Sequence, residues 1–199
     1  MPDRLVLASR SPIRAHLLRN AGLDFDVDSV AVDEKSIRAS LLAEGAPSRD
    51  IADALAELKA RRGADRHPDA LVIGCDQVLD HQGVLLSKPE DPNDARAQLA
   101  RLSDSRHKLL SAAVVYGEGR PLWRHVGQAT LTMRPLSKLY INDYVTRNWD
   151  SIRESVGCYK VEEEGARLFS RIDGDHFTVL GLPLLDLLSY LILRGTVPA

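Results

Sequence analysis

The stretch RLVLASRSPIRAHLLRNA, residues 4 to 21, predicts a strand, a turn and a helix in succession. Arg4 to Ala8 is an aliphatic run of strand length. Apolar residues then recur at helical spacing: Ile13, Leu17, Leu18 and Ala21. Ser11 is a suitable N-cap, and Pro12 suits the first helical position because its missing N–H needs no partner there. A helix N-terminus presents unpaired N–H groups, so the turn from Ser9 to Arg14 is a candidate phosphate-binding site.

A second decisive stretch, ALVIGCDQ, covers residues 70 to 77. Residues 70 to 74 are apolar throughout, which predicts a strand buried on both faces. Asp76 follows directly at the carboxyl end of this strand, where open α/β sheets place ligand-binding groups. A carboxylate in that position could hold a divalent cation or deprotonate water. The alternative is that Asp76 only caps the chain or forms a turn.

The rest of the chain mixes strands and helices. Further strands are predicted over residues 25–32, 84–86, 109–116, 122–133 and 177–181. Further helices are predicted over residues 48–63, 92–103, 137–145 and 182–193, with Asp91 and Ser137 as caps. Residues 146–176 are irregular. With no repeat and no linker, we expect one α/β domain over residues 1–199.

Composition narrows the class of protein. The chain has 199 residues and is 44% hydrophobic, which is enough for one buried core. Its net charge of −2 excludes a general nucleic-acid-binding surface. The N-terminus has no secretory signal, and the longest apolar stretch, 180–193, contains Asp186 and falls short of the ~18 residues of a membrane span. We therefore expect a cytoplasmic protein without membrane contact, with Cys75 and Cys158 as reduced thiols.

Three short clusters carry groups that suit triphosphate chemistry. They are Ser9 to Arg14, Gly74 to Gln77, and Ser87-Lys88-Pro89. Their hydroxyls, backbone N–H groups and cations are the donors that phosphate oxygens need, and arginine adds a bidentate fork. Phosphoryl transfer is accelerated mainly by positioning and charge neutralisation, so a few cations and one carboxylate suffice. Taken singly, Lys88 could equally be a solvated loop residue.

Taken together, these clusters resemble the Maf family of nucleotide pyrophosphatases. The matching motifs occur in the family's order: Leu7-Ala8-Ser9-Arg10-Ser11-Pro12-Ile13-Arg14, Leu17-Leu18, Gly22, Val32-Asp33-Glu34, Leu55-Ala56-Glu57-Leu58-Lys59-Ala60, Gly74-Cys75-Asp76-Gln77-Val78, Lys88-Pro89 and Gly181-Leu182-Pro183-Leu184. Ordered motifs over nearly the whole chain are more specific than any one of them. The resemblance implies a mixed, curved sheet flanked by helices, with two lobes around a cleft, and a homodimer.

The resemblance also implies an activity and roles for particular residues. The activity is hydrolysis of a nucleoside triphosphate between its α- and β-phosphates, with Mg²⁺ or Mn²⁺. By that analogy Asp76 is the general base, and Glu34 together with Asp76 contacts the metal. The residues that match the family's substrate-binding positions are Ser9, Arg14, Lys59 and Lys88.

The choice of nucleotide is predicted from Ile13, Gln77 and Glu162. Gln77 and Glu162 resemble the subgroup that acts on 7-methyl-GTP, because the dTTP/UTP subgroup typically has Thr and Gln there. Glu162 could accept hydrogen bonds from the N1–H and the exocyclic amine of guanine. Two alternatives stay open: a dTTP/UTP pyrophosphatase, and an inert nucleotide-binding regulator of septum formation. The acidic run Glu163-Glu164 departs from the family pattern, and we expect it to form a solvated surface loop.

Overall fold

The computed structural model describes residues 4–198 and divides into two compact units. Unit 1 contains the chain up to Gln77, residues Leu110–Gly127 and the chain from Asp175 onward. Unit 2 contains Val78–Leu109 and Gln128–Gly174. Three long strands supply residues to both units. One domain over 1–199 and a cleft between two lobes therefore stay predictions, because compact units that share strands can form one domain or two.

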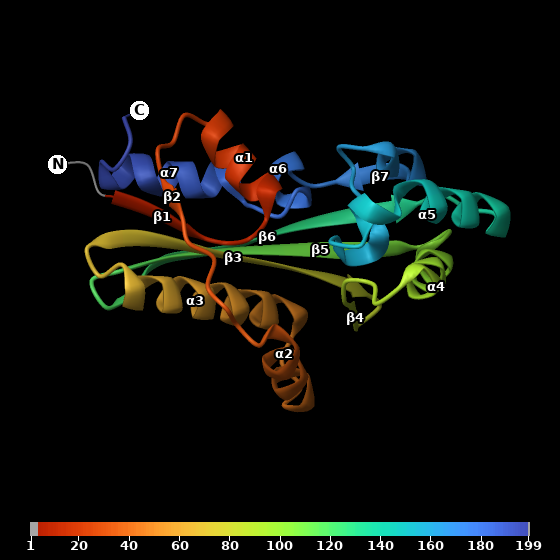
Figure 1. Ribbon diagram of the computed structural model, residues 1–199, viewed down its shortest axis with the longest axis horizontal. Coiled ribbons are helices and arrows are strands. Elements are labelled where there is room, and N and C mark those ends of the chain that lie inside the picture. The colour runs from red at the N-terminus through yellow and green to blue at the C-terminus, as the bar shows by residue number, and fades with distance from the viewer. Residues whose placement is uncertain (1–3, 199) are drawn as a thin grey trace. The chain divides into compact units, whose positions relative to one another are not determined.

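Seven strands form one mixed sheet in the order β2-β1-β3-β5-β6-β7, with β4 paired to β3 (Figure 1). Strand β1 runs parallel to β2 and β3, whereas β4 and β7 run antiparallel to their neighbours β3 and β6. The strands are β1 (Arg4–Ala8), β2 (Asp26–Val27), β3 (Ala70–His81), β4 (Val84–Leu86), β5 (Arg106–Gly117), β6 (Arg120–Met133) and β7 (Phe169–Asp173). The predicted mixed α/β sheet is confirmed.

Helices flank this sheet. The α-helices are α1 (Pro12–Asn20), α2 (Glu34–Ala43), α3 (Ser48–Arg66), α4 (Pro92–Leu102), α5 (Lys138–Ile152), α6 (His176–Val179) and α7 (Leu184–Arg194). Two 3₁₀ segments, η1 (Val156–Cys158) and η2 (Glu164–Leu168), lie in the stretch that the sequence left irregular. The predicted caps Asp91 and Ser137 each accept backbone N–H groups of the helix that follows.

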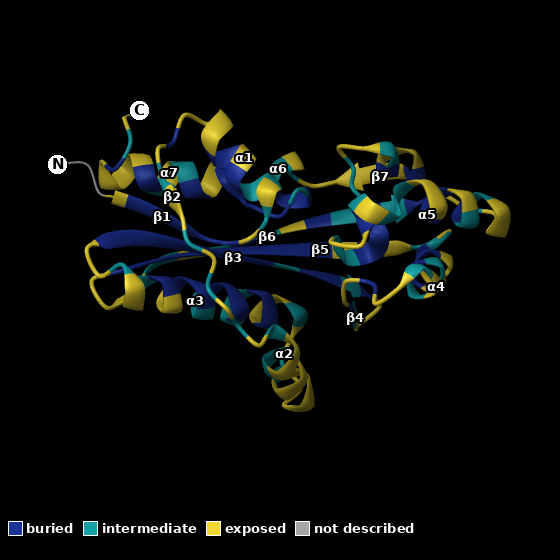
Figure 2. Cartoon of the chain, viewed as in Figure 1, coloured by how far each residue is buried: buried dark blue, intermediate teal, exposed yellow. Residues whose placement is uncertain are grey.

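In unit 1, helices cover both faces of β1 and β3. Helices α1 and α7 lie on one side and α3 on the other, and the strands between them are buried (Figures 1 and 2). Alternate residues of β1 serve the two faces: Leu5 and Leu7 join a core with α1 and α7, whereas Val6 and Ala8 pack in a second cluster. An all-apolar strand is the pattern that burial on both faces requires.

Five predicted elements differ from the structure. The helix expected over 137–145 continues to Ile152, into the stretch expected to be irregular. The helix expected to end at Gly63 continues to Arg66; this glycine lies inside α3, where an added Cβ would come within 2.7 Å of the Val72 side chain, so it permits close packing and does not end the helix. The strand expected over 25–32 has two residues, and α2 follows it. The strand expected over 70–74 continues to residue 81, and the one expected over 177–181 is largely the short helix α6.

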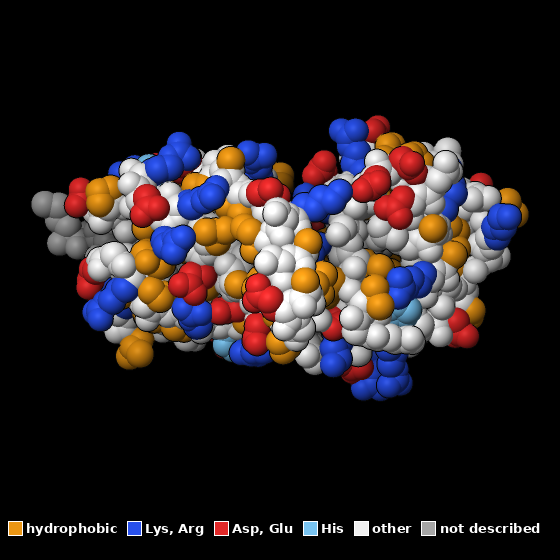
Figure 3. Space-filling view, turned by 90° about the horizontal axis from the view of Figure 1, so that it is seen from below, with side chains coloured by type: hydrophobic (Ala, Val, Ile, Leu, Met, Phe, Trp, Pro, Cys, Tyr) orange, Lys and Arg blue, Asp and Glu red, His pale blue; other side chains and the backbone are white. Residues whose placement is uncertain are grey.

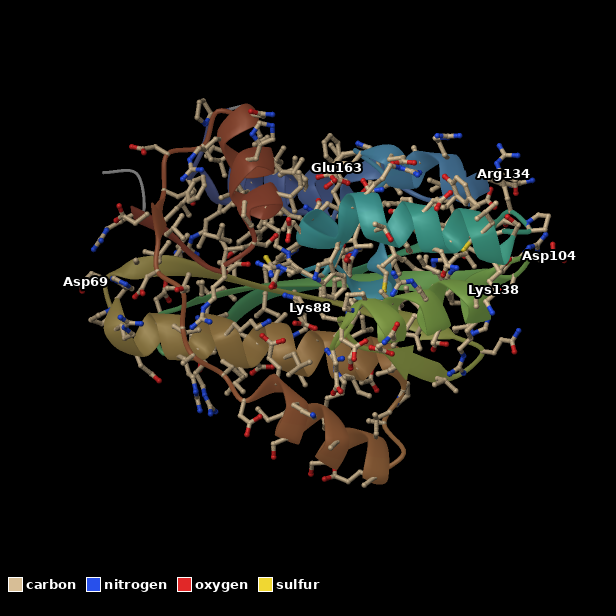
Figure 4. All side chains as sticks on the ribbon, turned by 45° about the vertical axis from the view of Figure 1, so that its right-hand side comes forward. Asp69, Lys88, Asp104, Arg134, Lys138 and Glu163 are labelled. Carbon is tan, nitrogen blue, oxygen red and sulfur yellow. The ribbon has the colours of Figure 1, made fainter. Side chains whose placement is uncertain are left out.

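In unit 2, α4 packs against α5 and η1, and β7 pairs with β6. The rings of His107, Tyr159 and Phe169 meet inside the unit, where the Tyr159 hydroxyl lies 2.7 Å from Nε2 of His107. Asp104 and Arg134 lie at one end of this unit, joined by a backbone hydrogen bond of 3.2 Å (Figure 4).

The charged surface residues and the two cysteines are placed as the sequence predicts. Basic and acidic side chains are interspersed on the face in Figure 3. Cys75 and Cys158 are buried free thiols, as predicted. Within residues 4–198, none of the helices has the length and apolar character needed to cross a bilayer.

Candidate active site

Two parallel strands bring the site together in unit 1. Strand β1 pairs with β3 so that Ala8 lies opposite Gly74. Ser9 directly follows β1, and Cys75 and Asp76 come next on β3, so the three residues lie at the same level of the sheet. Asp76 therefore lies inside β3, and the prediction that it sits at the carboxyl end of the strand is wrong, because β3 continues to His81. This register explains why two motifs far apart in sequence contribute to one site.

Lys59 on helix α3 contacts the carboxylate of Asp76 on β3. Lys59 Nζ lies 2.7 Å from Asp76 Oδ1 and 2.8 Å from a carboxylate oxygen of Glu34 at the start of α2. Asp76 is 4% exposed and Lys59 is 9% exposed. The helix approaches closely because Gly74 has no side chain; a Cβ there would collide with the backbone of Ala56 and Ala60.

The carboxyl group of Asp76 has an unusual environment. Burial raises its pKa, and the ammonium of Lys59 opposes this rise without cancelling it. Its Oδ2 is buried and accepts no hydrogen bond within the part of the chain that the structure describes. Buried carboxylate oxygens ordinarily have partners, so this atom is a candidate for contact with a ligand, a water molecule or a metal.

Arg14 on α1 is fixed by three hydrogen bonds, none of them to a carboxylate. Nε donates to the carbonyl of Gly181 at 2.7 Å, and Nη1 donates to the carbonyl of Cys75 at 3.1 Å and to Ser9 Oγ at 3.3 Å. Ser9 Oγ also accepts the backbone N–H of Ser11 at 3.2 Å. The guanidinium is thus positioned but keeps its charge available for an anion.

Two predicted specificity residues lie near this arrangement. Gln77 follows Asp76, and its Nε2 donates to Ser111 Oγ and to the carbonyls of Thr178 and Val179. Ile13 is partly buried and packs against the apolar core of unit 1. The site in unit 1 therefore combines a buried carboxylate, a lysine, an arginine, a hydroxyl and an amide.

Known proteins are similar to this sequence. The family described as "Maf-like protein" matches residues 4–193. The chain belongs to the Maf family. A relative from Ruegeria pomeroyi, named nucleoside triphosphate pyrophosphatase, is 64% identical over 97% of both chains. A relative from Brucella abortus, named 7-methyl-GTP pyrophosphatase, is 47% identical over 96% of both. A dITP/XTP pyrophosphatase structure from Mycobacterium abscessus matches 98% of both chains with 16% identity and a TM-score of 0.43, too weak a similarity to carry an argument.

Two further predicted site residues of this Maf protein belong to unit 2. Lys88, labelled in Figure 4, is exposed and its Nζ lies 3.0 Å from Glu154 Oε2, which lowers the pKa of that carboxyl group. Glu162 is exposed in a turn between η1 and η2. The structure thus brings together Ser9, Arg14, Glu34, Lys59, Asp76 and Gln77 in unit 1, whereas Lys88 and Glu162 are placed within unit 2.

The acidic run after Glu162 is at least partly exposed, as expected, and its carboxylates also accept specific hydrogen bonds. Glu163 accepts hydrogen bonds from Ser151 and Lys160, and Glu164 accepts from Arg147 and Asn148. These donors lower the pKa of both carboxyl groups. The extra negative charge is therefore compensated inside unit 2.

Sequence reasoning missed the residues that hold Arg14 and Gln77 in place. Gly181 belongs to a motif that the resemblance quotes, but the sequence alone assigned it no contact. Ser111 is the one hydroxyl in the apolar run LLSAAVV of β5, and it is fully buried. A lone polar residue inside a buried strand is a signal for a specific hydrogen bond, and it was available in the sequence.

Proposed function

We propose that this Maf protein hydrolyses 7-methyl-GTP, or another modified nucleoside triphosphate, between the α- and β-phosphates to give the monophosphate and pyrophosphate. The coarser activity follows from the family and its relatives: the chain is a nucleoside triphosphate pyrophosphatase, a hydrolase that acts on acid anhydrides. The observation that carries the proposal is the buried Asp76, whose Oδ2 has no hydrogen-bond partner among residues 4–198 while Lys59 contacts Oδ1.

Asp76 suits the role of general base. A base works best when its pKa lies near the working pH, and burial raises the pKa of this carboxyl group toward that range. Lys59 fixes the carboxylate through Oδ1. Oδ2 is thereby the atom that would accept the proton of the attacking water.

The cations suit the phosphates. Arg14 presents a guanidinium without a carboxylate partner among residues 4–198, and Ser9 lies beside it. Lys59 lies next to Asp76, so it would balance charge on the phosphate that is attacked. Lys88, in unit 2, is the fourth predicted phosphate-binding residue, and its exposed ammonium could exchange Glu154 for an anion.

A divalent cation fits the carboxylates of this site. Glu34 and Asp76 both contact the Lys59 ammonium, and carboxylate oxygens are the donors that Mg²⁺ and Mn²⁺ prefer. Across residues 4–198 no group of three or more acidic, histidine or cysteine residues is arranged so that it could hold a metal ion, so water and phosphate oxygens would supply the other ligands. When bound, the cation would neutralise charge on the phosphates.

The preference for 7-methyl-GTP rests on Ile13, Gln77 and Glu162. Glu162 is exposed and its carboxylate could accept two hydrogen bonds from a guanine edge. The Brucella abortus relative, whose name states 7-methyl-GTP, is similar over 96% of this chain. The positive charge of a 7-methylated guanine would add attraction to a carboxylate.

The test is pyrophosphate release by the purified chain with Mg²⁺ or Mn²⁺ on 7-methyl-GTP, GTP, dTTP, UTP and CTP, with Asp76→Asn as the control. We expect 7-methyl-GTP to be preferred and the control to be inactive. A preference for dTTP or UTP would overturn the choice of nucleotide. An absence of metal-dependent turnover on all five would overturn the proposed function and favour the inert regulator. Light scattering on the same sample tests the predicted homodimer.

A further inference from the structure

Gln77 is held by three hydrogen bonds that all start from one atom. Its Nε2 donates to Ser111 Oγ at 3.0 Å, to the carbonyl of Val179 at 3.0 Å and to that of Thr178 at 3.3 Å. The amide nitrogen has two N–H groups and three acceptors, so one N–H group is shared between two acceptors. Ser111 Oγ donates in turn to the carbonyl of Thr178 at 2.7 Å.

This network allows only one orientation of the amide. If the amide were reversed, Oε1 would face two backbone carbonyl oxygens and would be repelled by them. Of the three groups that Nε2 contacts, the Ser111 hydroxyl alone could donate to a reversed amide, and its hydrogen is already given to the carbonyl of Thr178. Turning that hydrogen toward a reversed Gln77 would leave a buried carbonyl without its short hydrogen bond, which is costly.

The free end of Gln77 lies beside the arginine of the site. No hydrogen bond to Oε1 is found within residues 4–198. A Cβ added to Gly181 would lie 3.7 Å from Oε1 and 3.3 Å from Nε of Arg14. The acceptor and the cation therefore border the same turn between α6 and α7.

We infer that Ser111 is a positioning residue for substrate recognition: it holds Nε2 of Gln77 against the carbonyls of Thr178 and Val179 at the end of α6, so that Oε1 faces the nucleotide as a hydrogen-bond acceptor. This inference rests on the proposed function and adds the polarity of the contact to it. Gln77 selects a base that offers an N–H donor. A base that offers an acceptor in that position is disfavoured, because two acceptors would then face each other.

The hold on Gln77 is tested without turnover. The chain has four glutamines, Gln77, Gln82, Gln98 and Gln128, so their side-chain NH₂ signals can be assigned by NMR in glutamine-labelled protein. We expect the Gln77 NH₂ signal to be protected from solvent exchange in the wild type and to exchange at least about tenfold faster in Ser111→Ala. Ser111→Thr keeps the hydroxyl and is expected to keep the protection.

A matched control is Ser105→Ala in unit 2. Ser105 Oγ likewise donates to a backbone carbonyl, that of Leu102 at 2.7 Å, and contacts a side chain, His81 at 3.1 Å. This variant loses the same kind of hydroxyl without touching Gln77. Ser105→Ala therefore shows the effect of losing a structural hydrogen bond alone, without any change at the Gln77 amide. We expect it to leave the exchange of the Gln77 NH₂ signal unchanged.

The recognition is tested by kinetics on the same five nucleotides. We expect Ser111→Ala to raise KM for the preferred nucleotide about tenfold, to change kcat less than about twofold, and to reduce the preference over the others, because a positioning contact mainly affects binding. Ser111→Thr and Ser105→Ala are expected to keep the preference. Unchanged exchange of the Gln77 NH₂ in Ser111→Ala, or faster exchange with an unchanged preference, overturns the inference. A wild type that turns over none of the nucleotides overturns the proposed function, and with it the assigned role in recognition, whatever the exchange result.

Discussion

Replacing Lys59 with methionine is expected to make the stability of this protein depend strongly on pH. The change keeps an unbranched side chain of similar length but removes the ammonium from between Asp76 and Glu34. In the variant, the carboxylate of Asp76 has lost the ammonium beside it, and because Asp76 is almost fully buried, water cannot replace that ammonium. Removing one partner of a buried ion pair costs about 3–5 kcal/mol when the other charge remains.

The direction of the pH dependence follows from the pKa of Asp76. Burial already raises this pKa and Lys59 lowers it, so the variant raises it further above the unfolded value. A raised folded-state pKa means that the folded chain binds a proton more tightly than the unfolded chain. The stabilising effect of that proton is present at acidic pH and is lost as the pH rises through the folded-state pKa, with a slope of up to about 1.4 kcal/mol per pH unit.

The assay is urea unfolding of Lys59→Met and wild type at about pH 5 and about pH 8. We expect a loss of about 3 kcal/mol at the higher pH and a clearly smaller loss at the lower one. Lys138→Met, which removes an exposed lysine from the first turn of α5, is the matched control and should lose less than about 0.5 kcal/mol at either pH. Adding Asp76→Asn to Lys59→Met should restore much of the stability. Equal losses for both lysine variants at both pH values would refute the reasoning.

Three other perturbations have defined outcomes. Gly74→Ala should destabilise unit 1 by more than about 2 kcal/mol in urea unfolding, since its Cβ would overlap backbone atoms of α3; a loss as small as that of Gly119→Ala, which has positive φ but open space, would contradict the close approach. Arg14→Lys should lower kcat/KM about tenfold or more in the pyrophosphate assay, because an ammonium cannot replace a fork that bonds Gly181, Cys75 and Ser9; an unchanged kcat/KM would show that the charge alone suffices. The pH profile of kcat/KM should lose activity as the pH falls through the pKa of Asp76, which burial places above the ordinary value of 3.8, and an acidic limb at or below that value would exclude Asp76 as the titrating base.

The sequence alone was sufficient for the elements whose signals are local. The strand and helix around Ser9 to Arg14 were predictable because an aliphatic run, a serine and a proline at the first helical position lie next to one another. Ser11 occupies the N-cap position as predicted, but its side chain makes no capping hydrogen bond. The caps Asp91 and Ser137 were predictable for the same reason, since each accepts N–H groups only two or three residues ahead. The position of Asp76 directly after an apolar run marked it as a candidate, but the sequence alone did not show what surrounds it.

Only the tertiary structure decided how the site residues meet. Lys59 lies between Asp76 and Glu34 because α3 packs directly on β3, and that approach depends on the absence of a side chain at Gly74. No local pattern encodes such a contact, since it depends on which helix covers which face of the sheet. The orientation of Gln77 likewise depends on a hydroxyl from β5 and on carbonyls from α6, about a hundred residues further along the chain. Residue types are local information, whereas the direction in which an amide points is set by neighbours that only folding brings together.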